Sequence, residues 1–118
     1  MIVRSSSNLS TPPGKPAFDH YPDPGEVSLQ EALDALADPV RRAIVRLIAA
    51  DPEWTRPCGT FDLPVKKATL SHHFAVLRAA GLLEQRDVGT RRLNRLRRRE
   101  FDAAFPGLLD LVLAAPED

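Results

Sequence analysis

The chain has 118 residues, of which 43% are hydrophobic and 27% are charged, and its formal net charge is zero. This length fits one globular domain and excludes two full cores or a typical metabolic enzyme. No apolar run approaches the roughly 18–20 residues that span a bilayer, and the N-terminus lacks the order of a secretory signal. The single cysteine, Cys58, excludes an intramolecular disulfide. We therefore expect a cytoplasmic protein with no membrane partner.

The zero net charge conceals a strong segregation of charge along the chain. Residues 65–99 carry ten basic and two acidic side chains, whereas residues 100–118 carry five acidic side chains and no basic ones. A basic excess of this size within one segment is the electrostatic footprint of a polyanion binder. Because charge blocks more often form a solvated, mixed surface, charge alone leaves both interpretations open.

The N-terminal segment, residues 1–26, holds five of the eleven prolines and few aliphatic side chains. Such a composition cannot bury enough apolar area to offset the entropy of ordering, so it predicts a mostly flexible arm. The last part of this segment, residues 18–24, contains two aromatic side chains, and we expect it to dock on the body of the protein. The folded domain is predicted to span residues 27–115.

Two capped helices are predicted at the start of that domain. Ser28 and Glu31 fit a capping box. The apolar positions that follow at helical spacing are Leu29, Leu33 and Leu36. Asp38 then suits an N-cap and Pro39 the first position of a second helix, which is expected to end at Asp51. The apolar stripe of this second helix comprises Val40, Ala43, Ile44, Leu47 and Ile48.

The next part of the domain is predicted to contain two further helices and a hairpin. A short, weak helix is expected near residues 60–64 and a longer one over residues 68–80. The core stripe of the longer helix comprises Leu70, Phe74 and Leu77. Apolar and polar residues alternate at 82–88 and 91–96 around a Gly-Thr turn, which predicts a β-hairpin.

The C-terminal part is predicted to be helical as well. Residues 100–105 form a helical turn, and residues 106–114 form a helix that is apolar almost all round. In a small domain such a helix has to bury against something large, often a partner subunit. The element order predicts a mainly α protein with a small β-hairpin. It is that of a winged helix-turn-helix, in which the third and fourth helices make the pair and the hairpin makes the wing.

The helix at 68–80 is the candidate DNA-reading element. The face opposite its core stripe carries Ala68, His72, Ala75 and Ala79, with Lys67 and Ser71 on the shoulder. Small side chains permit close approach to a major groove, and Ser, His and Lys reach base edges and phosphates. The position of His72 favours a base contact, whereas His73 falls beside the core stripe and favours a packing role.

Arginines gather in and after the hairpin. Side chains around its tip and edges, which could grip phosphates or enter a minor groove, are Arg86, Arg91, Arg92 and Arg95. The alternative for these residues is a solubilising surface. Arg97, Arg98 and Arg99 could instead start the last helix or reach nearby acidic groups.

The sequence contains no catalytic or metal-binding constellation. Ser71 and His72 would point about 100° apart on a helix, so they form no nucleophile–base pair, and we expect no enzyme. His72 and His73 diverge in the same way, and neither a metal nor a cofactor is predicted. Cys58 is more readily a buried small residue than a thiol sensor, although Arg56 would lower the pKa of its thiol and favour the thiolate.

Two motifs carry a resemblance to a known family. Residues 36–45 read LADPVRRAIV, and residues 69–83 read TLSHHFAVLRAAGLL. They resemble the second-helix entry and the recognition helix of the ArsR/SmtB family of bacterial winged-helix repressors, and the resemblance covers about residues 29–113. It implies a homodimer that binds double-stranded DNA at an imperfect palindrome and represses nearby genes until a signal releases it.

The resemblance also implies roles for individual residues. A dimer interface built from the first and last helices would comprise Leu29, Leu33, Leu108, Leu109, Leu111 and Val112. Some positions match DNA-contacting residues of the family, and others are their neighbours in the recognition helix and the wing. Together they give the candidate DNA contacts Lys66, Lys67, Thr69, Ser71, His72, Arg78, Arg91 and Arg92. The family usually has Ser-Gln where this chain has the two lysines, so we expect a steeper salt dependence of binding.

Departures from the family point to a non-metal branch. Residues 55–57 stand where metal-sensing members often carry Cys-x-Cys, and the last helix contains no His. Two signals stay open: oxidation of Cys58, and a small apolar molecule bound between the subunits near Phe101 and Phe105. A third alternative, from another functional class, is a winged-helix module whose basic face binds an acidic protein.

Overall fold

The computed structural model describes residues 12–51, 54, 56–57 and 63–116. The helices of this part of the chain are the 3-10 turn η2 (Pro24–Glu26), α1 (Leu29–Leu36), α2 (Pro39–Ala50), α3 (Lys67–Ala79), α4 (Arg98–Ala104) and α5 (Leu108–Ala114). Its strands are β1 (Lys15–Pro16), β2 (Arg56–Pro57), β3 (Leu83–Val88) and β4 (Arg91–Leu96). The elements have the order of a winged helix-turn-helix, as the sequence predicts.

The predicted caps form at both early helices. The hydroxyl of Ser28 accepts from the amide of Glu31 over 3.1 Å, while the Glu31 carboxylate accepts from the Ser28 amide over 2.9 Å. The Asp38 carboxylate accepts from the amides of Val40 and Arg41 over 2.7 and 3.2 Å. The predicted starts of α1 and α2 are therefore confirmed.

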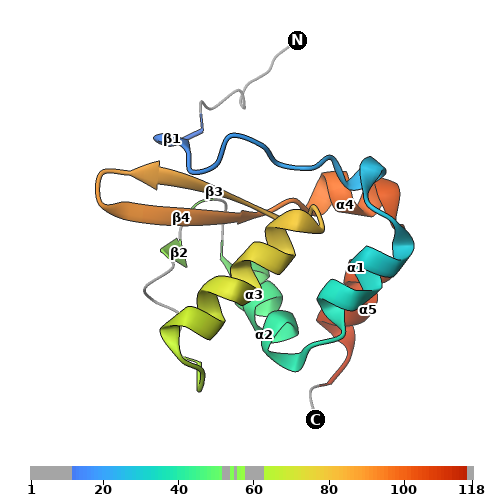
Figure 1. Ribbon diagram of the computed structural model, residues 1–118. Helices are drawn as coiled ribbons and strands as arrows, with labels where there is room; N and C mark the ends of the chain where they lie inside the picture. The colour runs from blue at the N-terminus through green and yellow to red at the C-terminus, as the bar shows by residue number, and fades with distance from the viewer. Residues whose placement is uncertain (1–11, 52–53, 55, 58–62, 117–118) are drawn as a thin grey trace.

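The hairpin pairs β3 with β4 around the predicted Gly-Thr turn. Its ladder runs from Leu83 opposite Leu96 to Val88 opposite Arg91, and the sheet order is β1-β3-β4-β2. Figure 1 shows the hairpin extending away from the helices, with α3 leading into its base and α2 behind α3. The core at the junction contains the fully buried side chains of Ile44, Leu77, Leu82, Leu83, Phe101 and Leu109.

Helix α1 buries Leu36, Ala32 and Ala35, which are 5%, 0% and 1% exposed. The two other apolar residues at helical spacing, Leu29 and Leu33, are 57% and 45% exposed. The small alanines let α1 approach the body closely, which leaves the two leucines outside. The predicted short helix at 60–64 falls mostly outside the described residues.

Residues 12–26, called the N-terminal strap below, run along the hairpin. Strand β1 pairs antiparallel with β3, and the strap then passes the end of α3 and reaches α4 at η2 (Figure 1). Gly14 adopts φ +56°, and a Cβ there would lie 1.8 Å from the carbonyl oxygen of Asp87. Only glycine therefore permits this approach to the hairpin backbone. Residues 1–11 lie outside the described part of the chain.

Candidate nucleic-acid interface

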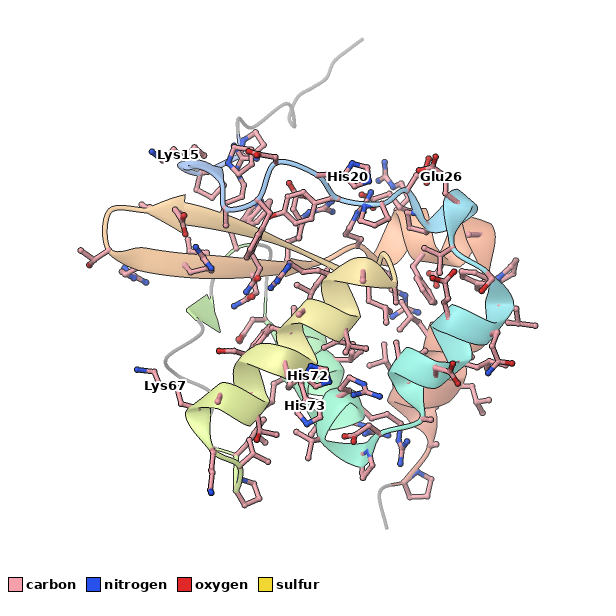
Figure 2. All side chains as sticks on the ribbon, viewed as in Figure 1. Lys15, His20, Glu26, Lys67, His72 and His73 are labelled. Atoms are coloured by element: carbon pink, nitrogen blue, oxygen red, sulfur yellow. The ribbon has the colours of Figure 1, made fainter. Side chains whose placement is uncertain are left out.

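The N-terminal half of α3 presents an exposed, polar face. Its exposed side chains, together with the preceding residue, are Lys66, Lys67, Ala68, Thr69, Ser71 and His72. Lys66 occupies the N-cap position and makes no side-chain cap bond. Figure 2 shows Lys67 projecting from the start of the helix, away from the other helices. Five of the predicted DNA contacts therefore share one accessible surface.

His73, one residue further along, lies in a different environment. Its side chain is 7% exposed, and Nη1 of Arg41 donates to Nδ1 of His73 over 3.1 Å. Arg41 also donates to the carbonyl oxygens of Ala35 and Asp34 at the end of α1, over 2.7 and 3.0 Å. His73 thus ties α3 to α1 through α2, in agreement with the packing role expected from the sequence.

Arg78, another predicted DNA contact, is half-buried and bonded within the subunit. Its Nη1 donates to Oε1 of Gln85 over 2.6 Å, and its Cζ lies 3.8 Å from the ring centroid of Phe18 in the strap. The amide of Gln85 donates in turn to Oδ1 of Asn94 over 2.8 Å, and both amide side chains are buried. Arg78 is therefore separated from the exposed face at the start of α3.

Some arginines of the wing bond to other residues of the subunit, and Arg91 is exposed. Arg92 donates to both carboxylate oxygens of Asp87 over 2.9 and 3.3 Å, and this hydrogen bonding holds the pKa of Asp87 below its ordinary value. Arg86 donates to the carbonyl oxygen of Pro13 over 2.7 Å. Arg91, at the end of the turn, is exposed.

Acidic side chains pair with the arginines at the base of the wing. Arg95 donates to Glu84 over 3.2 Å and to Glu100 over 2.7 Å. Burial favours a raised pKa for Glu100, but hydrogen bonding and charge from Arg95, with the charge of Arg97, bring that pKa below its ordinary value. Arg98 donates to Asp102 over 2.8 Å. Arg98 also pairs with Asp110 of α5.

These pairs reduce the cationic surface that the sequence suggested. The basic residues between 65 and 99 that are exposed and make no hydrogen bond or ion pair with another described residue are Lys66, Lys67, Arg91 and Arg99. Asp87 and Glu84 meet Arg92 and Arg95 across the strand pair, which chain order alone did not reveal. Asp102 lies four residues after Arg98 on the same helix, in line with the expected alternative that these arginines reach nearby acidic groups.

The residues predicted for a dimer interface separate into two groups. Leu29, Leu33 and Leu111 are 57%, 45% and 66% exposed, while Leu109 and Val112 are 0% and 8% exposed and belong to the subunit core. An open, apolar groove of about 510 Å³ lies between α1 and the α4–α5 turn. Its lining residues are Leu29, Ala104, Phe105, Pro106, Gly107, Leu108 and Leu111.

The remaining predictions concern other kinds of site. Cys58, the candidate thiol sensor, lies outside the described residues. Across the part of the chain that the structure describes, no three His, Cys, Asp or Glu side chains gather in a way that could hold a metal ion. No helix within those same residues has the length and apolar character needed to cross a membrane.

Comparisons with known proteins agree with the geometry. Residues 36–86, which run from the end of α1 into β3, match the family described as a helix-turn-helix domain. The chain is also similar to the HTH-type transcriptional regulator Rv2034 of Mycobacterium tuberculosis, with 42% identity over 69 residues. That alignment spans 58% of this chain and 64% of the relative. The fold is thus a winged helix-turn-helix, and these likenesses support a helix-turn-helix regulator.

Proposed function

We propose that this protein is a DNA-binding transcriptional regulator that inserts α3 into a major groove and sets its wing tip against nearby phosphates. The observation that carries the proposal is the accessible face at the start of α3, with Lys67, Ser71 and His72, together with the exposed Arg91 of the wing. Lys and Arg supply phosphate contacts, while Ser and His reach base edges. Likeness to a transcriptional regulator supports the same role.

The regulator acts as a homodimer in this proposal. Leu29, Leu33 and Leu111 are exposed on adjoining helices, and two of them line the same apolar groove. An exposed apolar surface on a small domain marks an interaction site, and a second copy covers it with the same surface. Two α3 helices about 34–36 Å apart would then enter successive major grooves of a palindromic operator.

The regulatory direction follows from the family resemblance of the two motifs, at residues 36–45 and 69–83. We propose an ArsR/SmtB-type repressor of the non-metal branch, acting in the cytoplasm and released from its operator by a signal other than a metal. The exposed lysines at the start of α3 give this repressor a marked phosphate component of binding.

The test is a selection of bound duplexes from a random-sequence pool. Fluorescence anisotropy on the enriched duplex and on a scrambled duplex of equal length, at physiological salt, then gives the specificity. Specific binding by such proteins is typically 10³-fold or more tighter than non-specific binding. A palindromic enriched sequence with a preference of this size supports the proposal, whereas equal and weak binding of both duplexes overturns it.

A second function, a winged-helix module for an acidic protein, draws on the internal pairing of Arg92, Arg95 and Arg98. That pairing leaves a smaller cationic face for a nucleic acid. This alternative predicts the absence of any sequence preference in the same selection, together with retention of an acidic protein from a lysate that Lys67→Glu abolishes.

A further inference from the structure

Phe18 of the N-terminal strap lies against two guanidinium groups from different parts of the fold. The Cζ of Arg78, in the last turns of α3, lies 3.8 Å from the ring centroid of Phe18. The Cζ of Arg92, on the wing strand β4, lies 4.9 Å from the same centroid. A single aromatic ring therefore contacts both the candidate DNA-reading helix and the wing.

The hairpin backbone holds the residues before and after Phe18 in place. The amide of Ala17, just before Phe18, donates to the carbonyl oxygen of Gln85 over 3.0 Å. The hydroxyl of Tyr21, three residues after Phe18, donates to that same oxygen, and the two rings meet edge to face with centroids 6.3 Å apart. Phe18 is thus anchored independently of its contacts with the arginines.

Arg78 is fixed from a second direction. Oε1 of Gln85 accepts its hydrogen bond over 2.6 Å, and the Gln85 amide is itself bonded to Asn94 of β4 over 2.8 Å. Because Gln85 and Asn94 are 1% and 2% exposed, this layer has little freedom to rearrange. The guanidinium therefore connects the strap to the buried amide pair inside the hairpin.

We propose that Phe18 is a positioning residue for DNA binding, one that fixes the angle between α3 and the wing through Arg78 and Arg92. The inference rests on the proposed function, because DNA has to meet the helix and the wing at the same time. When DNA binds both elements, a wing that moves relative to α3 loses conformational entropy, and this loss weakens binding. A wing that is already fixed relative to α3 loses none. Phe18 exerts this effect without contacting DNA.

The test compares Phe18→Leu, which keeps an apolar side chain but removes the π face, with Phe18→Tyr, which keeps the face. His20→Ala, at an exposed position of the strap, is the matched control. We expect Phe18→Leu to weaken binding of the selected duplex by about fivefold to tenfold, and Phe18→Tyr and His20→Ala to bind as the wild type does. All variants should melt within a few degrees of the wild type.

A double-mutant cycle separates positioning from mere stability. If Phe18 acts by joining Arg78 to Arg92, Phe18→Leu causes a smaller loss in an Arg78→Gln background than it causes in the wild type. Amide hydrogen exchange without DNA gives a second readout, in which Phe18→Leu speeds exchange at the hairpin tip and Phe18→Tyr does not.

The outcomes are distinguishable. A wild type with no preference for the selected duplex overturns the proposed function and this inference with it. A wild type that binds specifically, with Phe18→Leu equally tight or with additive losses in the cycle, overturns the inference alone.

Discussion

Nη1 of Arg41 lies 3.1 Å from Nδ1 of His73, and this contact joins α2 to the buried side of α3. A guanidinium can only donate, so the ring nitrogen of His73 accepts. The adjacent His72 is exposed. Successive helical residues are turned by about 100°, which is enough to place two neighbouring histidines in opposite environments. Their substitution should therefore have opposite consequences.

His73→Ala should lower the free energy of unfolding by about 2 kcal/mol, because it opens a cavity and leaves a partly buried guanidinium N–H of Arg41 without its acceptor. His72→Ala, on the exposed face, should change it by no more than about 0.5 kcal/mol. Urea unfolding followed by circular dichroism measures both. Equal losses for the two variants would contradict the assignment of His73 as the structural residue.

His72→Ala should instead relax the choice of DNA sequence. Loss of a base contact reduces discrimination by about 1–3 kcal/mol while binding to scrambled DNA stays nearly constant. Anisotropy titrations on the selected and the scrambled duplex measure that difference directly. If His72→Ala weakens both duplexes to the same extent, His72 contacts the phosphate backbone and not a base.

Arg91→Ala and Arg95→Ala should separate a DNA contact from a structural ion pair. Arg91 is exposed, so its loss should weaken binding to all sequences and flatten the plot of log K against log salt by about one unit per subunit. Arg95 bonds Glu84 and Glu100, and its loss should cost about 1–2 kcal/mol of unfolding free energy. A salt slope that is unchanged in Arg91→Ala removes this residue from the interface.

Local rules account for the part of the fold that the sequence predicted well. The capping residues Ser28 and Asp38 act within three positions of themselves, and the turn between β3 and β4 sets the register of its own hairpin. Such local rules do not predict which face of α1 is buried. Hydrophobicity selects Leu29, whereas close packing of the subunit selects Ala32.

Long-range contacts account for what sequence reasoning missed in the candidate site. The excess of basic residues suggested a broad phosphate-binding surface, but Glu84 and Glu100 meet Arg95 only once the strands have paired and α4 has folded back. The stacking of Phe18 on Arg78 joins residues far apart in the chain. Aromatic residues within a proline-rich segment were the signal that this segment docks, and they did not reveal where.

Acid should remove the contribution of the cap at Asp38. Burial favours a raised pKa for this carboxyl, but the amides of Arg41 and Val40 and nearby positive charge bring the pKa below its ordinary value. A group whose pKa is lower in the folded state stabilises the fold when the pH is above its unfolded pKa, which is about 3.9 for Asp. That stabilisation is lost as the pH falls through the folded pKa. Asp38→Ala should therefore cost about 1 kcal/mol at neutral pH, and the difference from wild type should shrink below about pH 4.

The control for this prediction is Asp38→Asn, which retains a capping oxygen without a titrating group. Its unfolding free energy should stay close to that of the wild type at neutral pH, and its cap should persist in acid. Urea unfolding at a series of pH values measures all three proteins. A constant gap between wild type and Asp38→Ala down to low pH would show that the carboxylate charge plays no part in the cap.

Two leucines of α5, two residues apart, should distinguish the proposed dimer surface from the core. Leu111 is 66% exposed, so Leu111→Asp should leave the subunit folded and convert a homodimer to a monomer, because it places a charge in the apolar interface. Leu109 is fully buried, so Leu109→Asp should unfold the subunit. Sedimentation equilibrium gives the mass and circular dichroism the helical content. Because a monomer engages a single half-site, Leu111→Asp should also bind the palindromic duplex much more weakly than wild type. A Leu111→Asp protein that keeps the mass of the wild type, whether one subunit or two, would exclude this face as the dimer interface.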